Sequence, residues 1–199
     1  MLKKIFSFLL CSMLCFGSVN AVTQVESTEA FNWFRSAAEL GNARAQWDLA
    51  LVYYNGEGVP QNYVEAVKWF RLSAEQGYAK AQCNLGEMYN NGQGVAQDYA
   101  ETLKWYRLST DQGNLRGQYN LGMMYYNGQG VEKNDVEAAK LLRLSAEQGF
   151  APAQCNLGLM YYMGSGVTKN DNDAATWLRK AAIQGYTDAQ FFLKKFWAK

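Results

Sequence analysis

Apolar and small side chains recur at helical spacing along most of the chain. Ala45, Leu49 and Tyr53 stand at positions i, i+4 and i+8, which places them on one face of a helix. The same face returns every 36 residues, as Ala81-Leu85-Tyr89, Gly117-Leu121-Tyr125 and Ala153-Leu157-Tyr161. A fixed period of this length predicts stacked repeats, in which each unit buries its apolar face against its neighbours.

Each repeat is predicted to be a helical hairpin. The first helix, helix A, ends in a glycine-rich loop such as residues 55–59, because glycine adopts the positive φ that stops a helix. The second, helix B, starts at Asn62, followed by Glu65 as in a capping box, and ends at Gly77. The equivalent caps are Asp98, Asn134 and Asn170, and the glycines within helix A that predict close helix contact are Gly86, Gly122 and Gly158.

The repeats define the domain organisation. Residues 22–199 are predicted to form one all-α domain, a solenoid of four 36-residue helical hairpins. Half-repeats at residues 27–41 and 186–199 are predicted to cap its apolar ends, as stacked arrays require. The four copies span residues 42–77, 78–113, 114–149 and 150–185.

Residues 1–21 differ from the repeats and predict a cleaved secretory signal peptide. Lys3 and Lys4 precede an apolar run over residues 5–16, and small residues end the segment at Ala21. A lipoprotein signal is disfavoured, because Cys11 and Cys15 each follow a leucine where lipidation needs a small residue. No later apolar run is long enough to span a membrane. We therefore expect an exported protein, periplasmic or secreted, that is not transmembrane after cleavage.

Charge and residue types exclude several function classes. Removing residues 1–21 leaves 17 basic and 18 acidic residues, a net charge of −1, which does not suit nucleic-acid binding. The chain has no histidine, the commonest general base and metal ligand.

Cys83 and Cys155 stand two repeats apart, on the order of 20 Å, too far for a disulfide within the chain or a shared zinc site. A disulfide between chains stays open. The acidic run at residues 170–173 lacks the glycine and the final glutamate of a calcium loop. We expect no metal, no cofactor and no catalytic residue.

Two recurring strings carry a family resemblance. The patterns A-x-A-Q-x-N-L-G-x-M-Y-x-N-G-x-G-V and W-x-R-x-S-A-E-Q-G resemble the Sel-one-like repeat, a relative of the tetratricopeptide repeat, from Thr28 to Leu193. The resemblance implies a right-handed α-solenoid with helix A on the concave face. It also implies a non-catalytic scaffold, commonly exported, that binds a protein or peptide of unknown identity, and we expect a monomer.

Two other functions stay open. Some cysteine-rich relatives have been linked to beta-lactam binding or hydrolysis, so the alternative is an envelope enzyme of the beta-lactamase-like or cell-wall-acting type. The chain after residue 21 lacks the Ser-x-x-Lys of serine beta-lactamases and the cysteine pairs of those relatives. The second alternative is a structural spacer with no ligand on its concave face.

The resemblance also suggests a ligand site on helix A. In related tetratricopeptide domains a cation four residues before an asparagine clamps a peptide carboxylate, and Lys80 precedes Asn84 at this spacing. The alternative is that the asparagine belongs to the repeat consensus and the cations are only solvated. The arginine row from Arg35 to Arg179 is predicted to bond neighbouring repeats instead. The candidate peptide-binding residues are Arg44, Trp47, Lys80, Asn84, Arg116, Tyr119, Asn120 and Asn156.

Overall fold

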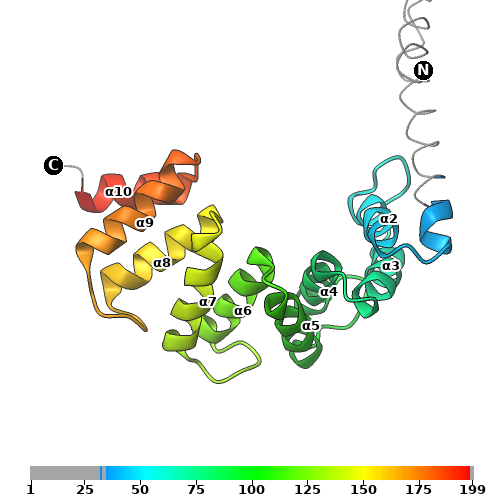
Figure 1. The fold of residues 1–199 in the computed structure, drawn as a ribbon, viewed down its shortest axis with the longest axis horizontal. Coiled ribbons are helices and arrows are strands. Elements are labelled where there is room, and N and C mark those ends of the chain that lie inside the picture. Colours follow the sequence, from blue (N-terminus) through cyan, green and yellow to red (C-terminus); the bar gives the residue numbers. More distant parts are fainter. Residues whose placement is uncertain (1–31, 33–34, 198–199) are drawn as a thin grey trace, which may run out of the picture.

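The computed structural model describes residues 32 and 35–197, and over these residues the fold is entirely helical (Figure 1). The predicted signal peptide and the first part of the N-terminal half-repeat lie outside the described residues. Residues 35–39 are helical. The following helices are α2 (Ala43–Asn55), α3 (Tyr63–Glu75), α4 (Ala79–Asn91), α5 (Tyr99–Asp111), α6 (Leu115–Asn127), α7 (Asp135–Glu147), α8 (Ala151–Met163), α9 (Asp171–Ile183) and α10 (Thr187–Trp197).

The helices stack in chain order. Each helix packs mainly against the helix before it and the helix after it. Figure 1 shows the result, an open arc that runs from α2 at one end to α10 at the other. Helices α2, α4, α6 and α8 are the A helices of the predicted hairpins, and α3, α5, α7 and α9 are the B helices. The predicted all-α solenoid is confirmed.

The helix ends follow the sequence signals. Gly56 closes α2 in the left-handed conformation, and its N–H donates to the Val52 carbonyl at 2.9 Å. Asn62 opens α3, where its side chain accepts from the Glu65 N–H at 3.1 Å. The Glu65 carboxylate pairs with Lys68 on the helix surface, at 3.4 Å. The same arrangement of glycine and capping residue recurs at Gly92 and Asp98, Gly128 and Asn134, and Gly164 and Asn170.

The glycines within the A helices allow the B helices to approach closely. A Cβ atom at Gly86 would lie 2.5 Å from Cδ1 of Tyr106, and one at Gly158 would lie 2.9 Å from Cγ of Leu178. Real Cβ atoms avoid such distances, so a larger residue would push the two helices apart. The predicted close contact is confirmed.

Buried hydrogen bonds repeat with the helices and hold each hairpin together. Ser73 on α3 donates to the Ala43 carbonyl at 2.6 Å, and Gln76 donates to the Gln46 side chain at 2.7 Å. Gln46 in turn donates to the Ala38 carbonyl of the preceding repeat at 3.1 Å. Satisfied buried polar groups of this kind fix the relative position of neighbouring helices. The equivalent pairs are Ser109 with Ala79, Ser145 with Leu115, Gln112 with Gln82, Gln148 with Gln118, and Gln184 with Gln154.

The arginine row links each B helix to the next A helix. The Arg71 guanidinium on α3 donates to the Tyr89 hydroxyl on α4 at 2.5 Å and lies 5.6 Å from the centre of that ring. The pairs Arg107–Tyr125 and Arg143–Tyr161 repeat the hydrogen bond at 3.3 and 2.5 Å. The predicted bonding between repeats is therefore confirmed for these three arginines.

Candidate functional site

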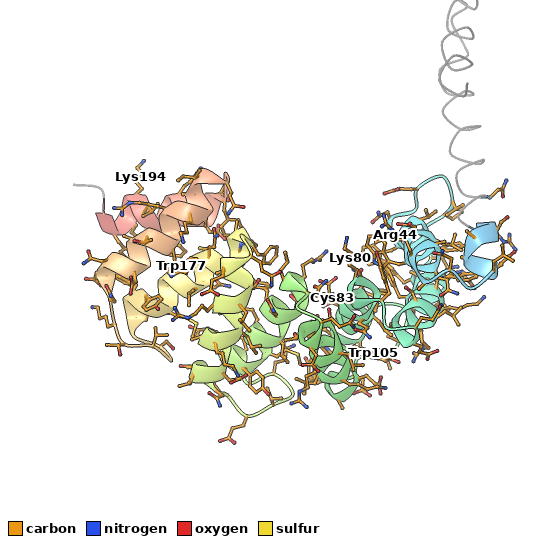
Figure 2. All side chains as sticks on the ribbon, viewed as in Figure 1. Arg44, Lys80, Cys83, Trp105, Trp177 and Lys194 are labelled. Carbon is orange, nitrogen blue, oxygen red and sulfur yellow. The ribbon has the colours of Figure 1, made fainter. Side chains whose placement is uncertain are left out.

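Helices α2, α4 and α6 together line a pocket of about 460 Å³, which we call the basic pocket. Trp47 comes from α2, Lys80 and Asn84 come from α4, and Arg116 comes from α6. Figure 2 shows Lys80 on the inner side of the arc. The other lining residues are Cys83, Gly113, Asn114, Leu115 and Gln148.

Trp47 occupies the centre of a polar and aromatic cluster. Its indole Nε1 donates to Asn84 Oδ1 at 2.8 Å, which fixes the orientation of the Asn84 amide. The Arg44 guanidinium lies 5.5 Å and the Lys80 ammonium 5.4 Å from the ring centre, within cation–π range. Tyr78 packs on the same ring edge-on, with the centroids 5.7 Å apart. Arg44, Lys80 and Asn84 are therefore gathered around one indole.

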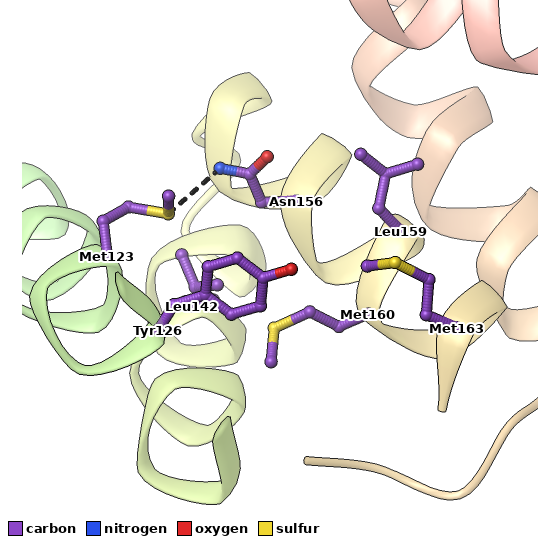
Figure 3. Close-up of a pocket in the computed structure, with 7 residues that line it drawn as sticks. All are labelled: Met123, Tyr126, Leu142, Asn156, Leu159, Met160 and Met163. Carbon is purple, nitrogen blue, oxygen red and sulfur yellow. Dashed lines mark hydrogen bonds between the residues drawn. The ribbon is translucent and has the colours of Figure 1, made fainter. Parts of the chain in front are cut away.

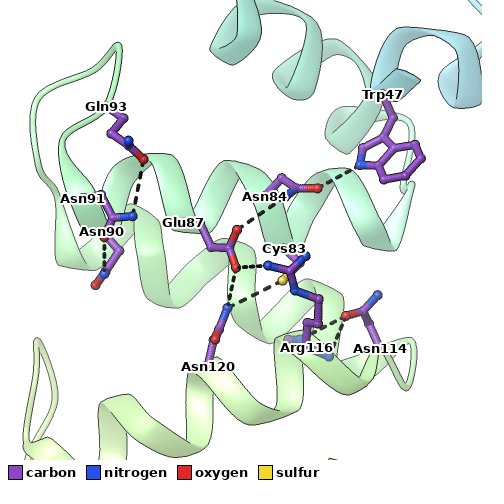
Figure 4. Close-up of polar contacts among 11 residues, drawn as sticks. Trp47, Cys83, Asn84, Glu87, Asn90, Asn91, Gln93, Asn114, Arg116 and Asn120 are labelled. Atoms are coloured by element: carbon purple, nitrogen blue, oxygen red, sulfur yellow. Dashed lines mark hydrogen bonds and ion pairs between the residues drawn. The ribbon is translucent and has the colours of Figure 1, made fainter. Parts of the chain in front are cut away.

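Glu87 occupies the centre of the predicted carboxylate clamp (Figure 4). Its Oε1 accepts from Arg116 Nη2 at 2.9 Å and from Asn120 Nδ2 at 3.1 Å. Its Oε2 accepts from Asn84 Nδ2 at 3.4 Å. The groups expected to hold the carboxylate of a ligand thus hold a carboxylate of the chain itself.

Sequence reasoning missed Glu87, although the repeat alignment contained a signal. The equivalent positions in the other copies are apolar: Leu51, Met123 and Leu159. A single charged residue at a position that is otherwise apolar indicates a local polar role. The partners of Glu87 on α6 become visible only when α4 and α6 are placed side by side.

The charges around the basic pocket do not cancel. Arg44 pairs with Asp48 at 3.0 Å, and Arg116 pairs with Glu87 at 2.9 Å. Lys80 forms no ion pair with any carboxylate in the part of the chain that the structure describes. One positive charge beside Trp47 is therefore left unbalanced, and it would attract an anion.

Cys83 lines the basic pocket as a free thiol. It is buried, and its sulfur accepts a weak hydrogen bond from Asn120 at 3.7 Å. Burial, aided by the negative charge of Glu87, raises the pKa of the Cys83 thiol to about 12. The Cys155 thiol is also buried and free, with its pKa raised to about 11. Both pKa values lie well above neutral pH, so both thiols stay protonated there.

A second pocket, of about 140 Å³, lies between α6 and α8, and we call it the methionine pocket (Figure 3). Asn156 on α8 donates to the Tyr119 hydroxyl at 3.2 Å, and the same nitrogen lies 3.3 Å from Met123 Sδ. Tyr119 packs edge-on against Phe150, with ring centroids 5.2 Å apart. The lining residues are Met123, Tyr126, Leu142, Asn156, Leu159, Met160 and Met163.

The structure thus divides the predicted site residues into two groups. Arg44, Trp47, Lys80, Asn84, Arg116 and Asn120 lie in or beside the basic pocket. Tyr119 and Asn156 lie at the methionine pocket instead. Among the described residues no group of three or more histidine, cysteine or acidic side chains is arranged to hold a metal ion.

The repeats match a known family model. The Sel1 repeat model matches residues 7–42, 43–78, 79–114, 115–150 and 151–186. The chain belongs to the Sel1 repeat family. The first matched segment overlaps the residues predicted to be a signal peptide, and the later segments follow the hairpins described above. A comparison with curated proteins gave no match.

Solved structures of other Sel1 repeat proteins share the fold. A protective antigen of uropathogenic Escherichia coli with this fold is 40% identical at a TM-score of 0.77, over 83% of this chain and 36% of that one. The chain therefore spans about a third of that protein. A Sel1 repeat protein from Oxalobacter formigenes is 34% identical at a TM-score of 0.81, over 86% of this chain and 70% of that one. Helicobacter pylori cysteine-rich protein B is 27% identical at a TM-score of 0.52, over 66% of this chain and 98% of that one.

A helix that crosses a membrane needs about 20 mostly apolar residues. None of the described helices is both long enough and apolar enough to cross a lipid bilayer.

Proposed function

We propose that this Sel1 repeat protein is an exported, non-catalytic scaffold that binds an acidic segment of another protein in the basic pocket. Sel1 repeats typically serve as scaffolds for protein interaction, and the family assignment supports this general role. The pattern of residues 1–21 supports export. The proposed binding surface is the face of the A helices on the concave side of the arc.

The observation that carries the proposal is the unbalanced ammonium group of Lys80. It lies in a pocket of about 460 Å³, large enough for one or two residues of an extended peptide. A carboxylate placed against Lys80 would form a charge-assisted hydrogen bond, and the indole of Trp47 beside it offers a flat apolar surface. Aromatic residues that become buried by a partner often dominate the energy of an interface.

Glu87 modifies the clamp that the sequence predicts. A ligand carboxylate would have to compete with Glu87 for Arg116 and Asn120, because both already donate to it. Lys80 has no such competitor among the described residues. We therefore assign the main anion contact to Lys80, with Arg116 as a secondary contact.

A capture experiment with charge-reversal variants tests the proposal. Binding partners are recovered from the native cell envelope by the wild type, by Lys80→Glu and by Lys140→Glu. The last variant makes the same charge change on α7, where Lys140 pairs only with Glu137 at 3.2 Å. We expect Lys80→Glu to lose the partner and Lys140→Glu to keep it. Equal recovery by all three proteins would contradict the assignment.

Two further measurements test export and the absence of catalysis. Amino-terminal sequencing of the protein isolated from its native cell is expected to begin at Val22, and an intact residue 1 would overturn the export proposal. A beta-lactam turnover assay is expected to give only the background rate. Hydrolysis that copurifies with the protein and disappears in a variant of the basic pocket would favour the envelope-enzyme alternative.

A further inference from the structure

The methionine pocket differs from the basic pocket in the partner of its asparagine. Asn120 donates to the carboxylate of Glu87 at 3.1 Å, whereas the equivalent Asn156 faces the thioether sulfur of Met123 at 3.3 Å. A thioether is a weak acceptor, and a peptide carbonyl is a much stronger one. The same amide also donates to the Tyr119 hydroxyl at 3.2 Å, so only its contact with Met123 Sδ is weak. That sulfur contact can be exchanged for a backbone carbonyl of a ligand at little cost.

The residues around Asn156 are apolar where those of the basic pocket are charged. Pro152 stands at the position of Lys80 and Arg116, and Leu159 stands at the position of Glu87. Met163 replaces the asparagine that ends the other A helices, and it is 54% exposed. Methionine side chains are flexible and polarisable, so they adapt to apolar groups of different shape. An exposed methionine at the mouth of an apolar pocket favours the binding of a large apolar side chain.

The two pockets are connected through α6. Arg116 at the start of this helix lines the basic pocket, and Met123 and Tyr126 further along it line the methionine pocket. The rise of an α-helix places Arg116 and Met123 roughly 10 Å apart along the axis. An extended peptide covers this axial distance with about three residues. One ligand segment can therefore reach both pockets.

We infer that the methionine pocket binds a large apolar side chain of an extended peptide, with the Asn156 amide bonded to the peptide backbone. The identity of the peptide rests on the proposed function: the same segment would place an acidic residue at Lys80, at least about three positions away. The binding of an apolar side chain by the methionine pocket does not depend on that link and can be tested alone.

Nuclear magnetic resonance of methionine methyl groups tests the pocket directly. The full chain, labelled with ¹³C at the methionine methyls, is titrated with N-acetyl-leucine methylamide and separately with N-acetyl-aspartate methylamide. We expect the leucine compound to shift the signals of Met123, Met160 and Met163, with half-saturation on the order of 1–10 mM for so small a ligand. The aspartate compound is expected to leave these three signals in place.

Variants copied from the repeats of the chain itself sharpen the test. Met163→Asn and Leu159→Glu install the residues found at the equivalent positions 91 and 87. Met163→Asn changes an exposed side chain, so the fold should persist, and we expect three- to tenfold weaker binding of the leucine compound. Leu159→Glu is expected to abolish binding. Val136→Asn on α7, at an exposed site outside the pocket, is the control and should bind like the wild type.

The outcomes separate this inference from the proposed function. Leucine-dependent shifts that the pocket variants weaken support the methionine pocket, even if the aspartate compound binds nowhere and the basic pocket fails. Shifts that are absent, or that Met163→Asn and Leu159→Glu leave unchanged, overturn the methionine pocket even if Lys80 proves to bind an acidic partner.

Discussion

The basic pocket and the methionine pocket occupy neighbouring places on the same stack of helices but have different chemistry. Lys80 lines the basic pocket, and Glu87 beside it accepts hydrogen bonds from the lining residues Arg116 and Asn84. Pro152 and Leu159 stand at the equivalent positions near the methionine pocket. Helix lengths, loop glycines and buried hydrogen bonds nevertheless repeat in both halves. The difference between the pockets therefore comes from a few side chains on a common frame.

This separation has a physical basis. The frame residues, such as Ser73 and Ser145, are buried and bond backbone groups of the helix beside them. The pocket residues that carry the difference, such as Lys80 and Met163, are exposed. A change in the frame should therefore alter stability in both halves, whereas a change in one pocket should alter binding there and leave the fold intact.

The largest expected effect comes from the loop glycines of the frame. Gly94 and Gly166 have φ values of 71° and 65°, and a Cβ atom at either would collide with the backbone at the start of the preceding B helix. We expect Gly94→Ala and Gly166→Ala each to lower the free energy of unfolding by about 2–4 kcal/mol. Urea denaturation measures the change. Gly77→Ala is the control, because its Cβ would meet open space and only its φ of 86° opposes alanine.

Equal losses at the two loops would support a common frame. If one variant were as stable as the wild type, the two halves would differ in their backbone packing as well as in their pockets.

A second effect is a loss of stability at alkaline pH from the buried thiols. The pKa of Cys83 is raised from 9.0 to about 12, so between these values the unfolded chain releases a proton that the folded chain keeps. Stability therefore falls as pH rises above about 9, by at most about 1.4 kcal/mol per pH unit for each thiol. Thermal unfolding at pH 8 and pH 10.5 measures the slope. Cys83→Ala and Cys155→Ala should each show a shallower slope than the wild type, because each variant removes one buried thiol. A slope equal to that of the wild type would contradict the prediction.

A third, smaller effect concerns the competition inside the basic pocket. Glu87→Gln keeps the size of the side chain but removes the charge that pairs with Arg116. We expect affinity for N-acetyl-aspartate methylamide to rise about three- to tenfold, because Arg116 becomes available and the net charge of the pocket increases. Tryptophan fluorescence follows the titration. Glu57→Gln, at an exposed loop position, should have no effect, and a decrease in affinity for Glu87→Gln would show that Glu87 positions the clamp rather than blocking it.

The smallest expected effect is a transfer of charge to the methionine pocket. Pro152→Arg installs the residue found at the equivalent positions 44 and 116, at a half-buried site in the first turn of α8. We expect Pro152→Arg to bind the aspartate compound near Asn156 roughly twofold more strongly than Pro152→Ala does. Added salt should reduce this difference. Pro152→Ala controls for the loss of proline. Equal binding by the two variants would mean that a cation at this position does not define an anion site.

Much of the fold could be predicted because its causes are local and repeated. Capping residues such as Asn62 and glycines such as Gly56 act within a few residues of their place in the sequence. The arginine row could be predicted for a related reason, since the arginines of α3, α5 and α7 each meet the equivalent tyrosine of the next A helix. The signal peptide at residues 1–21 stays a prediction.

The pockets could be predicted only in part, because their chemistry depends on contacts between repeats. Lys80 and Asn84 were placed correctly on one helix face, but Glu87 reaches Arg116 across 29 residues of sequence. Met123 and Met160 lie on different helices, α6 and α8, so nothing in their sequence positions indicates that they line one pocket. Asn156 on α8 bonds Tyr119 on α6, and this contact is known only once the two helices are placed together. Asn84 bonds Trp47 in the basic pocket instead.

Site-specific photo-cross-linking tests the central claim most directly. A photoreactive amino acid is placed at position 80 in the basic pocket, at position 163 in the methionine pocket, and at position 136 on α7 as the control. We predict that positions 80 and 163 capture the same partner in the native envelope and that position 136 captures none. Capture from position 136 alone, or of the same partner with equal yield from all three positions, would contradict binding on the concave face.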